Sequence, residues 1–139
     1  MKNDRQAGFT LVELLVVLAI IGLLAGLVGP KVLNQLGGAK SDTASVQIRD
    51  FEQALEIYML DTGEFPSTEQ GLEALVQNPG NVAGWNGPYL RRNEIPQDPW
   101  KRDYQYQYPG EKADFDILSY GADGKPGGEG DNADVGNWQ

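Results

Sequence analysis

A single carboxylate, Glu13, interrupts an otherwise apolar segment near the start of this chain. From Phe9 to Val28 no other residue is ionisable. Twenty helical residues extend about 30 Å, the thickness of the hydrocarbon core of a bilayer. A carboxylate in that layer costs on the order of 2–3 kcal/mol, so it needs a partner. A free α-amine, created by cleavage after Gly8, would serve; alternatively, Glu13 lies at the membrane surface and reaches the lipid headgroups.

A second chemically active segment is acidic and glycine-rich and runs from Gly121 to Asp134. Its side-chain oxygen donors are Asp123, Glu129, Asp131, Asn132 and Asp134. Hard oxygen ligands separated by flexible glycines suit Ca²⁺, which takes six to eight oxygens, although the closing glutamate of an EF-hand is missing. The residue chemistry alone leaves two alternatives open, a calcium-binding loop and a solvated acidic turn.

Composition restricts the other possible functions. The chain has no cysteine and no histidine, so disulfide frameworks and Ser/His/Asp or Cys/His catalysis are excluded. A membrane-anchored enzyme would have to use carboxylates, for example Asp114 and Asp116, but such pairs are commonly just solvated. The formal net charge of −9 disfavours nucleic acid as a partner.

The elements that must position these residues begin with a long helix. Ala39 to Asp61 carries an apolar stripe at helical spacing, formed by Ala44, Ile48, Phe51, Leu55 and Tyr58. Because no strong stop separates this stretch from the apolar segment, we predict one helix over about residues 9–61. Pro30 and the neighbouring glycines predict a flexible zone from Gly29 to Gly38.

Short elements follow the helix. A capping-box pattern at Ser67–Gln70 predicts a helix over Gly71–Val76. Period-two alternation predicts a hairpin of strands at Tyr104–Tyr108 and Phe115–Tyr120, with a third strand at Tyr89–Arg91. The predicted fold class is α+β: a long N-terminal helix, transmembrane in its first half, packs on a small antiparallel sheet and is followed by a metal-binding C-terminal loop.

The segment Gly8–Glu13, GFTLVE, lies between a short charged leader and an apolar helix and resembles the class III signal of type IV pilins and pseudopilins. The resemblance implies that a prepilin peptidase cuts after Gly8 and that Phe9 is then N-methylated. It also implies that Glu13 neutralises the terminal amine of a neighbouring subunit in a fibre.

Later segments resemble the major pseudopilins of the type II secretion system more closely. They are Phe65–Leu72, Asp98–Trp100, Tyr104–Tyr106 and the C-terminal loop. With the N-terminus, these segments extend the resemblance over nearly the whole chain. It implies a structural subunit whose helical homopolymer, the pseudopilus, drives export of folded proteins across the outer membrane. The alternative is a type IV pilin for adhesion, motility or DNA uptake, although many such pilins have a C-terminal disulfide loop.

The same resemblance implies an organisation in three parts: a leader of residues 1–8, a transmembrane and assembly helix over 9–35, and a periplasmic globular domain over 36–139. The chain would cross the inner membrane once and enter a periplasmic fibre after assembly. Its implied partners are further copies, minor pseudopilins, the inner-membrane assembly platform and the prepilin peptidase. Assembly would draw its energy from a cytoplasmic ATPase.

Major pseudopilins hold one Ca²⁺ in the C-terminal loop, so the resemblance also implies a ligand set. Asp123 and Asp134 are the best side-chain ligands, and Asp131 is the third. The backbone carbonyl groups of Tyr120 and Lys125 complete the shell. Trp138 is expected to hold the end of the loop against the domain.

Overall fold

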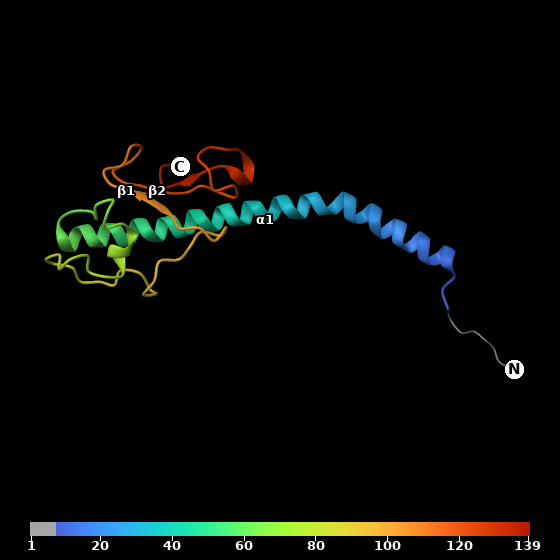
Figure 1. Ribbon diagram of the computed structural model, residues 1–139, viewed down its shortest axis with the longest axis horizontal. Coiled ribbons are helices and arrows are strands. Elements are labelled where there is room, and N and C mark those ends of the chain that lie inside the picture. Colours follow the sequence, from blue (N-terminus) through green and yellow to red (C-terminus); the bar gives the residue numbers. More distant parts are fainter. Residues whose placement is uncertain (1–7) are drawn as a thin grey trace. The chain divides into compact units, whose positions relative to one another are not determined.

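A computed structural model describes residues 8–139 of the 139-residue chain. Its elements are the helix α1 (Leu11–Thr62), the 3₁₀ turns η1 (Leu72–Leu75) and η2 (Gly130–Asn132), and the strands β1 (Gln105–Gln107), β2 (Asp116–Ser119) and β3 (Val135–Gly136) (Figure 1). The chain divides into two compact units at Leu36/Gly37. The first unit is helical from Leu11 onward, and the second contains the rest of α1 and all later elements.

The first half of α1 is apolar on every side. It contains an 18-residue window with a mean hydropathy of 2.9, none of which is buried. Leu11 and Leu23 expose 79% and 75% of their surface. A helix that is apolar all round needs an apolar environment, which a bilayer or neighbouring helices can provide.

The zone expected to be flexible, Gly29–Gly38, is helical in the single chain. Helix α1 runs without a break from Leu11 to Thr62 and includes Pro30. A proline inside a helix removes one backbone hydrogen bond, while the bonds formed by its neighbours can hold the turn. The single predicted helix is therefore confirmed, and the flexibility of this zone stays a prediction.

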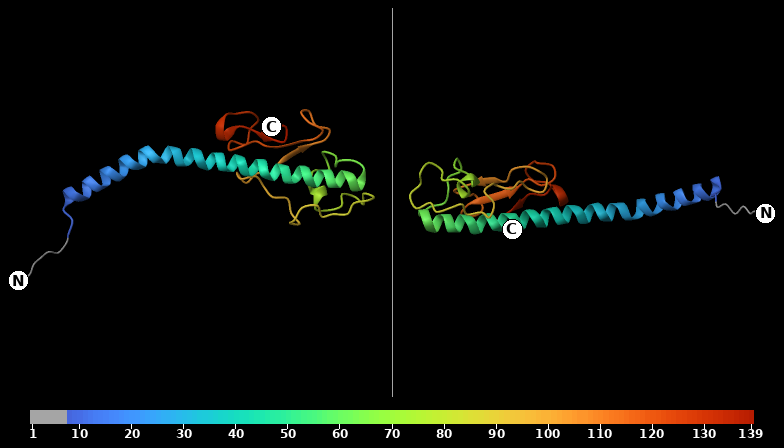
Figure 2. Two further views of the ribbon diagram at one scale, coloured as in Figure 1. Left: turned by 180° about the vertical axis from the view of Figure 1, so that it is seen from behind. Right: turned by 90° about the horizontal axis from the view of Figure 1, so that it is seen from below.

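The apolar stripe of the second half of α1 forms the core, which confirms the sequence prediction. Its five members expose at most 2% of their surface: Ala44, Ile48, Phe51, Leu55 and Tyr58. They pack with residues of η1 and of the sheet, among them Leu75, Tyr104 and Ile117. Figure 2 shows the hairpin and the C-terminal loop along this half of the helix.

The predicted hairpin is confirmed, whereas the predicted third strand at Tyr89–Arg91 is wrong. Strands β1 and β2 are antiparallel, with Tyr106 opposite Ile117. The third strand is β3, which pairs with the other edge of β2. Tyr89 belongs to a loop, where its N–H donates to the carbonyl of Leu75 at 2.7 Å and its hydroxyl donates to Asp61 at 2.9 Å.

The capping box forms, but it does not start the predicted helix. The Ser67 N–H donates to Oε1 of Gln70 at 2.8 Å, and the Gln70 N–H donates to Oγ of Ser67 at 3.1 Å. Gly71 then adopts a φ of 63°, which a continuing helix does not allow. The helix predicted at 71–76 is consequently shortened to the four-residue turn η1.

Two tyrosines, the buried Tyr104 and the half-buried Tyr106, make the second unit sensitive to alkaline pH. Burial raises the pKa of Tyr104 and of Tyr106 above the ordinary value of 10. The Tyr104 hydroxyl donates to Gln47, and the Tyr106 hydroxyl donates to the carbonyl of Pro66 at 2.6 Å. Above pH 10 the unfolded chain therefore releases these protons more readily than the folded chain, so stability falls as pH rises.

Below pH 10, we expect ionisation of these tyrosines to have no effect on the free energy of unfolding. Above pH 10, we expect the free energy of unfolding to decrease as the pH rises. Denaturant titrations at several alkaline pH values, followed by tyrosinate absorbance, measure this effect. The variant Tyr106→Phe should flatten the decrease. An equal slope in wild type and Tyr106→Phe would contradict the assignment to Tyr106.

Candidate functional site

The N-terminal site is organised by Thr10, which caps α1. The Thr10 hydroxyl accepts the N–H of Glu13 at 3.1 Å, and its carbonyl accepts the N–H of Leu14 at 3.1 Å. A threonine at this position satisfies a free N–H of the first helical turn. Helix α1 consequently begins at Leu11, two residues later than predicted, and Gly8 and Phe9 precede it. The leader was predicted over residues 1–8, of which residues 1–7 lie outside the described part of the chain.

Glu13 lies in the first turn of α1 and is exposed. Phe9, beside it in the sequence, exposes 79% of its surface. A carboxylate at this end of a helix interacts favourably with the helix dipole. The single chain therefore presents an acid within an uncovered apolar surface, and such a surface requires lipid or further copies of the helix to cover it.

Two of the expected calcium ligands belong to the C-terminal loop and face its own backbone. Oδ1 of Asp123 accepts the N–H of Lys125 at 3.1 Å. Oδ2 of Asp134 accepts the N–H of Gly127 at 3.0 Å. Both carboxylates thus retain oxygen lone pairs for another partner.

The other oxygen of Asp134 is buried and has no hydrogen-bond partner among the residues that the structure describes. An unsatisfied buried acceptor costs roughly 1–3 kcal/mol, so it calls for an explanation such as an ion. Between Gly8 and Gln139, no residue donates a hydrogen bond to the carbonyl oxygens expected as ligands, those of Tyr120 and Lys125. Carboxylate and carbonyl oxygens are the type of ligand that a hard cation such as Ca²⁺ takes.

Asp131 is placed differently from the other two aspartates. Its carboxylate lies against the backbone of α1 at Gly37, where an added side chain would overlap it. Within residues 8–139, no three acidic side chains gather closely enough to form a metal-holding group. The structure thus brings Asp131 to the helix and leaves Asp123 and Asp134 on the loop.

The carboxylate pair considered for catalysis has a structural role. Asp116 is 6% exposed. Its carboxylate accepts the N–H groups of Glu111 at 2.8 Å, Lys112 at 3.2 Å and Ala113 at 3.0 Å. Asp116 therefore holds the turn between β1 and β2 closed, while Asp114 is exposed.

Trp138, at the end of the loop, is half-buried. The ring of Trp138 lies directly against Gly136, where an added side chain would overlap it. The ammonium group of Lys112 lies 4.1 Å from the centre of that ring, within the range of a cation–π contact.

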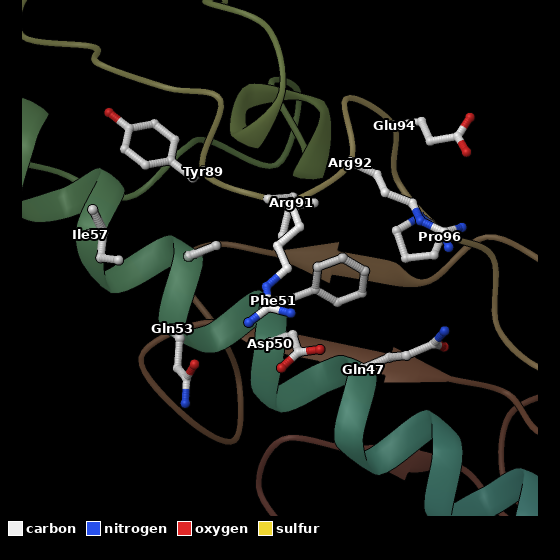
Figure 3. A pocket seen from close by; sticks show the side chains of 12 residues that line it. Gln47, Asp50, Phe51, Gln53, Ile57, Tyr89, Arg91, Arg92, Glu94 and Pro96 are labelled. Atoms are coloured by element: carbon white, nitrogen blue, oxygen red, sulfur yellow. The ribbon is translucent and has the colours of Figure 1, made fainter.

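Sequence reasoning did not identify a groove beside the second half of α1. It has a volume of about 730 Å³ and is lined by residues of α1 and of the loop 89–96. Figure 3 shows Arg91 extending from this loop toward Asp50 and Phe51 of the helix. The groove combines apolar side chains with two arginines, 91 and 92, and two acidic residues, Asp50 and Glu94.

Two sequence-family models together match almost the whole chain. The model described as "Prokaryotic N-terminal methylation motif" matches residues 3–29. The model described as "Type II secretion system (T2SS), protein G" matches residues 31–138. The boundary between the two matches therefore falls close to Pro30.

Individual relatives agree with these matches. The type II secretion system core protein G of Pseudomonas aeruginosa is 48% identical over 142 residues, covering 99% of each chain. That of Vibrio cholerae is 46% identical over 140 residues, covering 99% of this chain and 94% of the relative. The crystal structure of the major pseudopilin from the type 2 secretion system of enterohaemorrhagic Escherichia coli is similar with a TM-score of 0.65 and 39% identity, covering 81% of this chain and 89% of that one.

Proposed function

The chain belongs to the type II secretion system protein G family, and from that premise we propose how it acts as a subunit of a fibre. It is a structural pseudopilin and not an enzyme, and it assembles into a pseudopilus with other components of the secretion system. The match of the methylation motif to residues 3–29 and of the protein G model to residues 31–138 carries this conclusion. It favours a pseudopilin over the alternative of a type IV pilin for adhesion, motility or DNA uptake.

The apolar half of α1 anchors the chain in a membrane, and the acidic second unit belongs in the periplasm. We propose that the membrane is the inner membrane and that the chain crosses it once. Subunits then leave it to join a periplasmic helical homopolymer. Assembly of copies through contacts that do not close on themselves produces a filament. The proposed partners are minor pseudopilins and the inner-membrane assembly platform.

Processing by prepilin peptidase supplies the amine that Glu13 needs. Cleavage between Gly8 and Phe9 is supported by their position before the cap at Thr10, where the backbone is not held in the helix. The new amine of Phe9 is methylated and remains positively charged. In the fibre, Glu13 of one copy pairs with the Phe9 amine of its neighbour, so that both charges enter the apolar helix bundle together.

We expect the membrane-extracted protein to begin at N-methyl-Phe9. Intact-mass analysis should give the mass of residues 9–139 plus one methyl group, and N-terminal sequencing should identify the modified phenylalanine. A Gly8→Leu variant should keep the leader, because the peptidase would meet a branched side chain at the cleavage site. Retention of Met1 in the wild-type membrane form would contradict the proposed processing.

We also propose that the C-terminal loop binds one Ca²⁺. Asp123 and Asp134 would hold it with the carbonyl oxygens of Tyr120 and Lys125, and the unpaired oxygen of Asp134 supports this assignment. Asp131 would join them only by leaving Gly37. The ion supplies positive charge between carboxylates that otherwise repel one another, so its binding energy becomes folding energy of the loop.

A further inference from the structure

The turn at residues 98–102 is attached to the start of the C-terminal loop through Asp98. This aspartate is 4% exposed, and both of its carboxylate oxygens accept hydrogen bonds. Oδ1 accepts the N–H groups of Trp100 at 3.0 Å and Arg102 at 2.9 Å. Oδ2 accepts the hydroxyl of Ser119, a fully buried residue at the end of β2, at 2.6 Å. Asp98 thereby fixes the positions of Arg102 and Ser119 relative to each other.

Ser119 and Arg102 in turn hold both sides of Gly121. The Ser119 hydroxyl oxygen accepts the Gly121 N–H at 3.2 Å. Nη1 of Arg102 donates to the carbonyl of Gly121 at 3.1 Å and to that of Ala122 at 3.3 Å. The Arg102 side chain also lies against Gly124, where an added side chain would overlap the guanidinium. One guanidinium group thus contacts the backbone at both ends of the segment from Gly121 to Gly124.

This segment includes Asp123 and directly follows the carbonyl of Tyr120, two of the proposed calcium ligands. We propose that Asp98, Ser119 and Arg102, here called the loop bracket, are positioning residues that hold residues 120–124 in place before a cation binds. The inference rests on the proposed calcium site. Partners of metal ligands that act in this way typically contribute 10–100-fold to metal affinity.

Arg102 could affect the Ca²⁺ affinity through its charge or through its positioning of the loop. The two effects change the affinity in opposite directions. A guanidinium close to a cation site repels Ca²⁺, so charge alone predicts that Arg102→Ala binds Ca²⁺ more tightly. Positioning predicts the opposite, since the variant releases the carbonyls of Gly121 and Ala122. Ser119→Ala removes the contact to the Gly121 N–H without changing the charge, so only positioning predicts an effect for it.

The test is a Ca²⁺ titration of the full chain in detergent micelles by isothermal calorimetry. We expect Arg102→Ala and Ser119→Ala each to bind Ca²⁺ about tenfold or more weakly than wild type. Arg102→Lys should recover part of the affinity, because its ammonium can donate to one of the carbonyls. Arg92→Ala is the matched control: it removes the same charge from the groove beside α1 and should leave the affinity unchanged. Wild-type or tighter affinity in Arg102→Ala would overturn the positioning role.

Hydrogen exchange in EDTA distinguishes failure of the bracket from failure of the calcium site. Without metal, the amides of Gly121 and Ala122, which donate to Ser119 and Asp131, should exchange severalfold faster in Arg102→Ala and Ser119→Ala than in wild type or Arg92→Ala. Equal exchange would overturn the inference. A different result would separate the two proposals: wild type binds no Ca²⁺, yet the two variants lose amide protection. That result would overturn the calcium proposal and support the holding of the loop by the loop bracket.

Discussion

Glu13→Gln should insert into the membrane normally and fail to form fibres. Glutamine has nearly the shape of glutamate but no charge, so the methylated amine of the neighbouring Phe9 would enter the apolar bundle without a counter-ion. A charge left unpaired in this way costs on the order of 2–3 kcal/mol at each subunit contact. Since 1.4 kcal/mol is a factor of ten, the concentration needed for assembly should rise roughly 30–150-fold. Fibre yield by electron microscopy and sedimentation measures the loss, and alkaline extraction of membranes measures insertion.

Leu15→Ala is the control for this experiment. Leu15 is 64% exposed in the same part of α1, and its truncation perturbs the apolar surface without affecting any charge. It should reduce the fibre yield much less than Glu13→Gln does. Glu13→Asp keeps the charge on a shorter side chain and should recover part of the assembly. Normal fibres from Glu13→Gln would rule out pairing with the amine.

The parts of the fold that could be predicted are those whose pattern of apolar or aromatic residues repeats along the chain. The stripe from Ala44 to Tyr58 repeats the helical period over four turns, and each member of it is buried. The alternating segment at 104–108 predicted β1 because every second residue carries an aromatic ring. The segment Gly8–Glu13 was informative for another reason: it places a carboxylate where the surrounding residues make it costly.

Features created by contacts between distant residues were not predictable in this way. Strand β3 has only two residues, too few for a period to be seen. It is secured by Asn137, whose N–H donates to the carbonyl of Ile117 at 3.1 Å and whose side-chain oxygen accepts the Ile117 N–H at 2.9 Å. The contact of Asp131 with Gly37 is likewise invisible in the sequence, as 94 positions separate the two residues. The acidic composition of the loop did not predict its geometry, and the calcium chemistry that it suggests stays a prediction.

Removal of Ca²⁺ should lower the melting temperature of the second unit substantially. At a free Ca²⁺ concentration 100 times the dissociation constant, binding stabilises the folded state by about 2.7 kcal/mol. For a domain of about 100 residues, each kcal/mol corresponds to about 4–8 °C, so chelation should lower the melting temperature by roughly 10–20 °C. Thermal unfolding of the full chain in detergent, with Ca²⁺ and with EDTA, measures the shift. Mg²⁺ should restore much less, since it requires a tighter octahedral shell than a glycine-rich loop provides.

Two variants in the C-terminal loop should distinguish the contribution of the bound ion to stability from that of the loop residues themselves. Asp123→Ala should melt in Ca²⁺ near the temperature of wild type in EDTA, and chelation should have little further effect on it. Asp134→Asn should be less stable than wild type in Ca²⁺ but equally or more stable than wild type in EDTA. The reason is that it removes the charge from a carboxylate whose buried oxygen has no partner. Asp114→Asn, an exposed carboxylate outside the loop, should behave as wild type in both conditions. An unchanged wild-type melting curve on chelation would remove the calcium site, and the unpaired oxygen of Asp134 would then need another explanation.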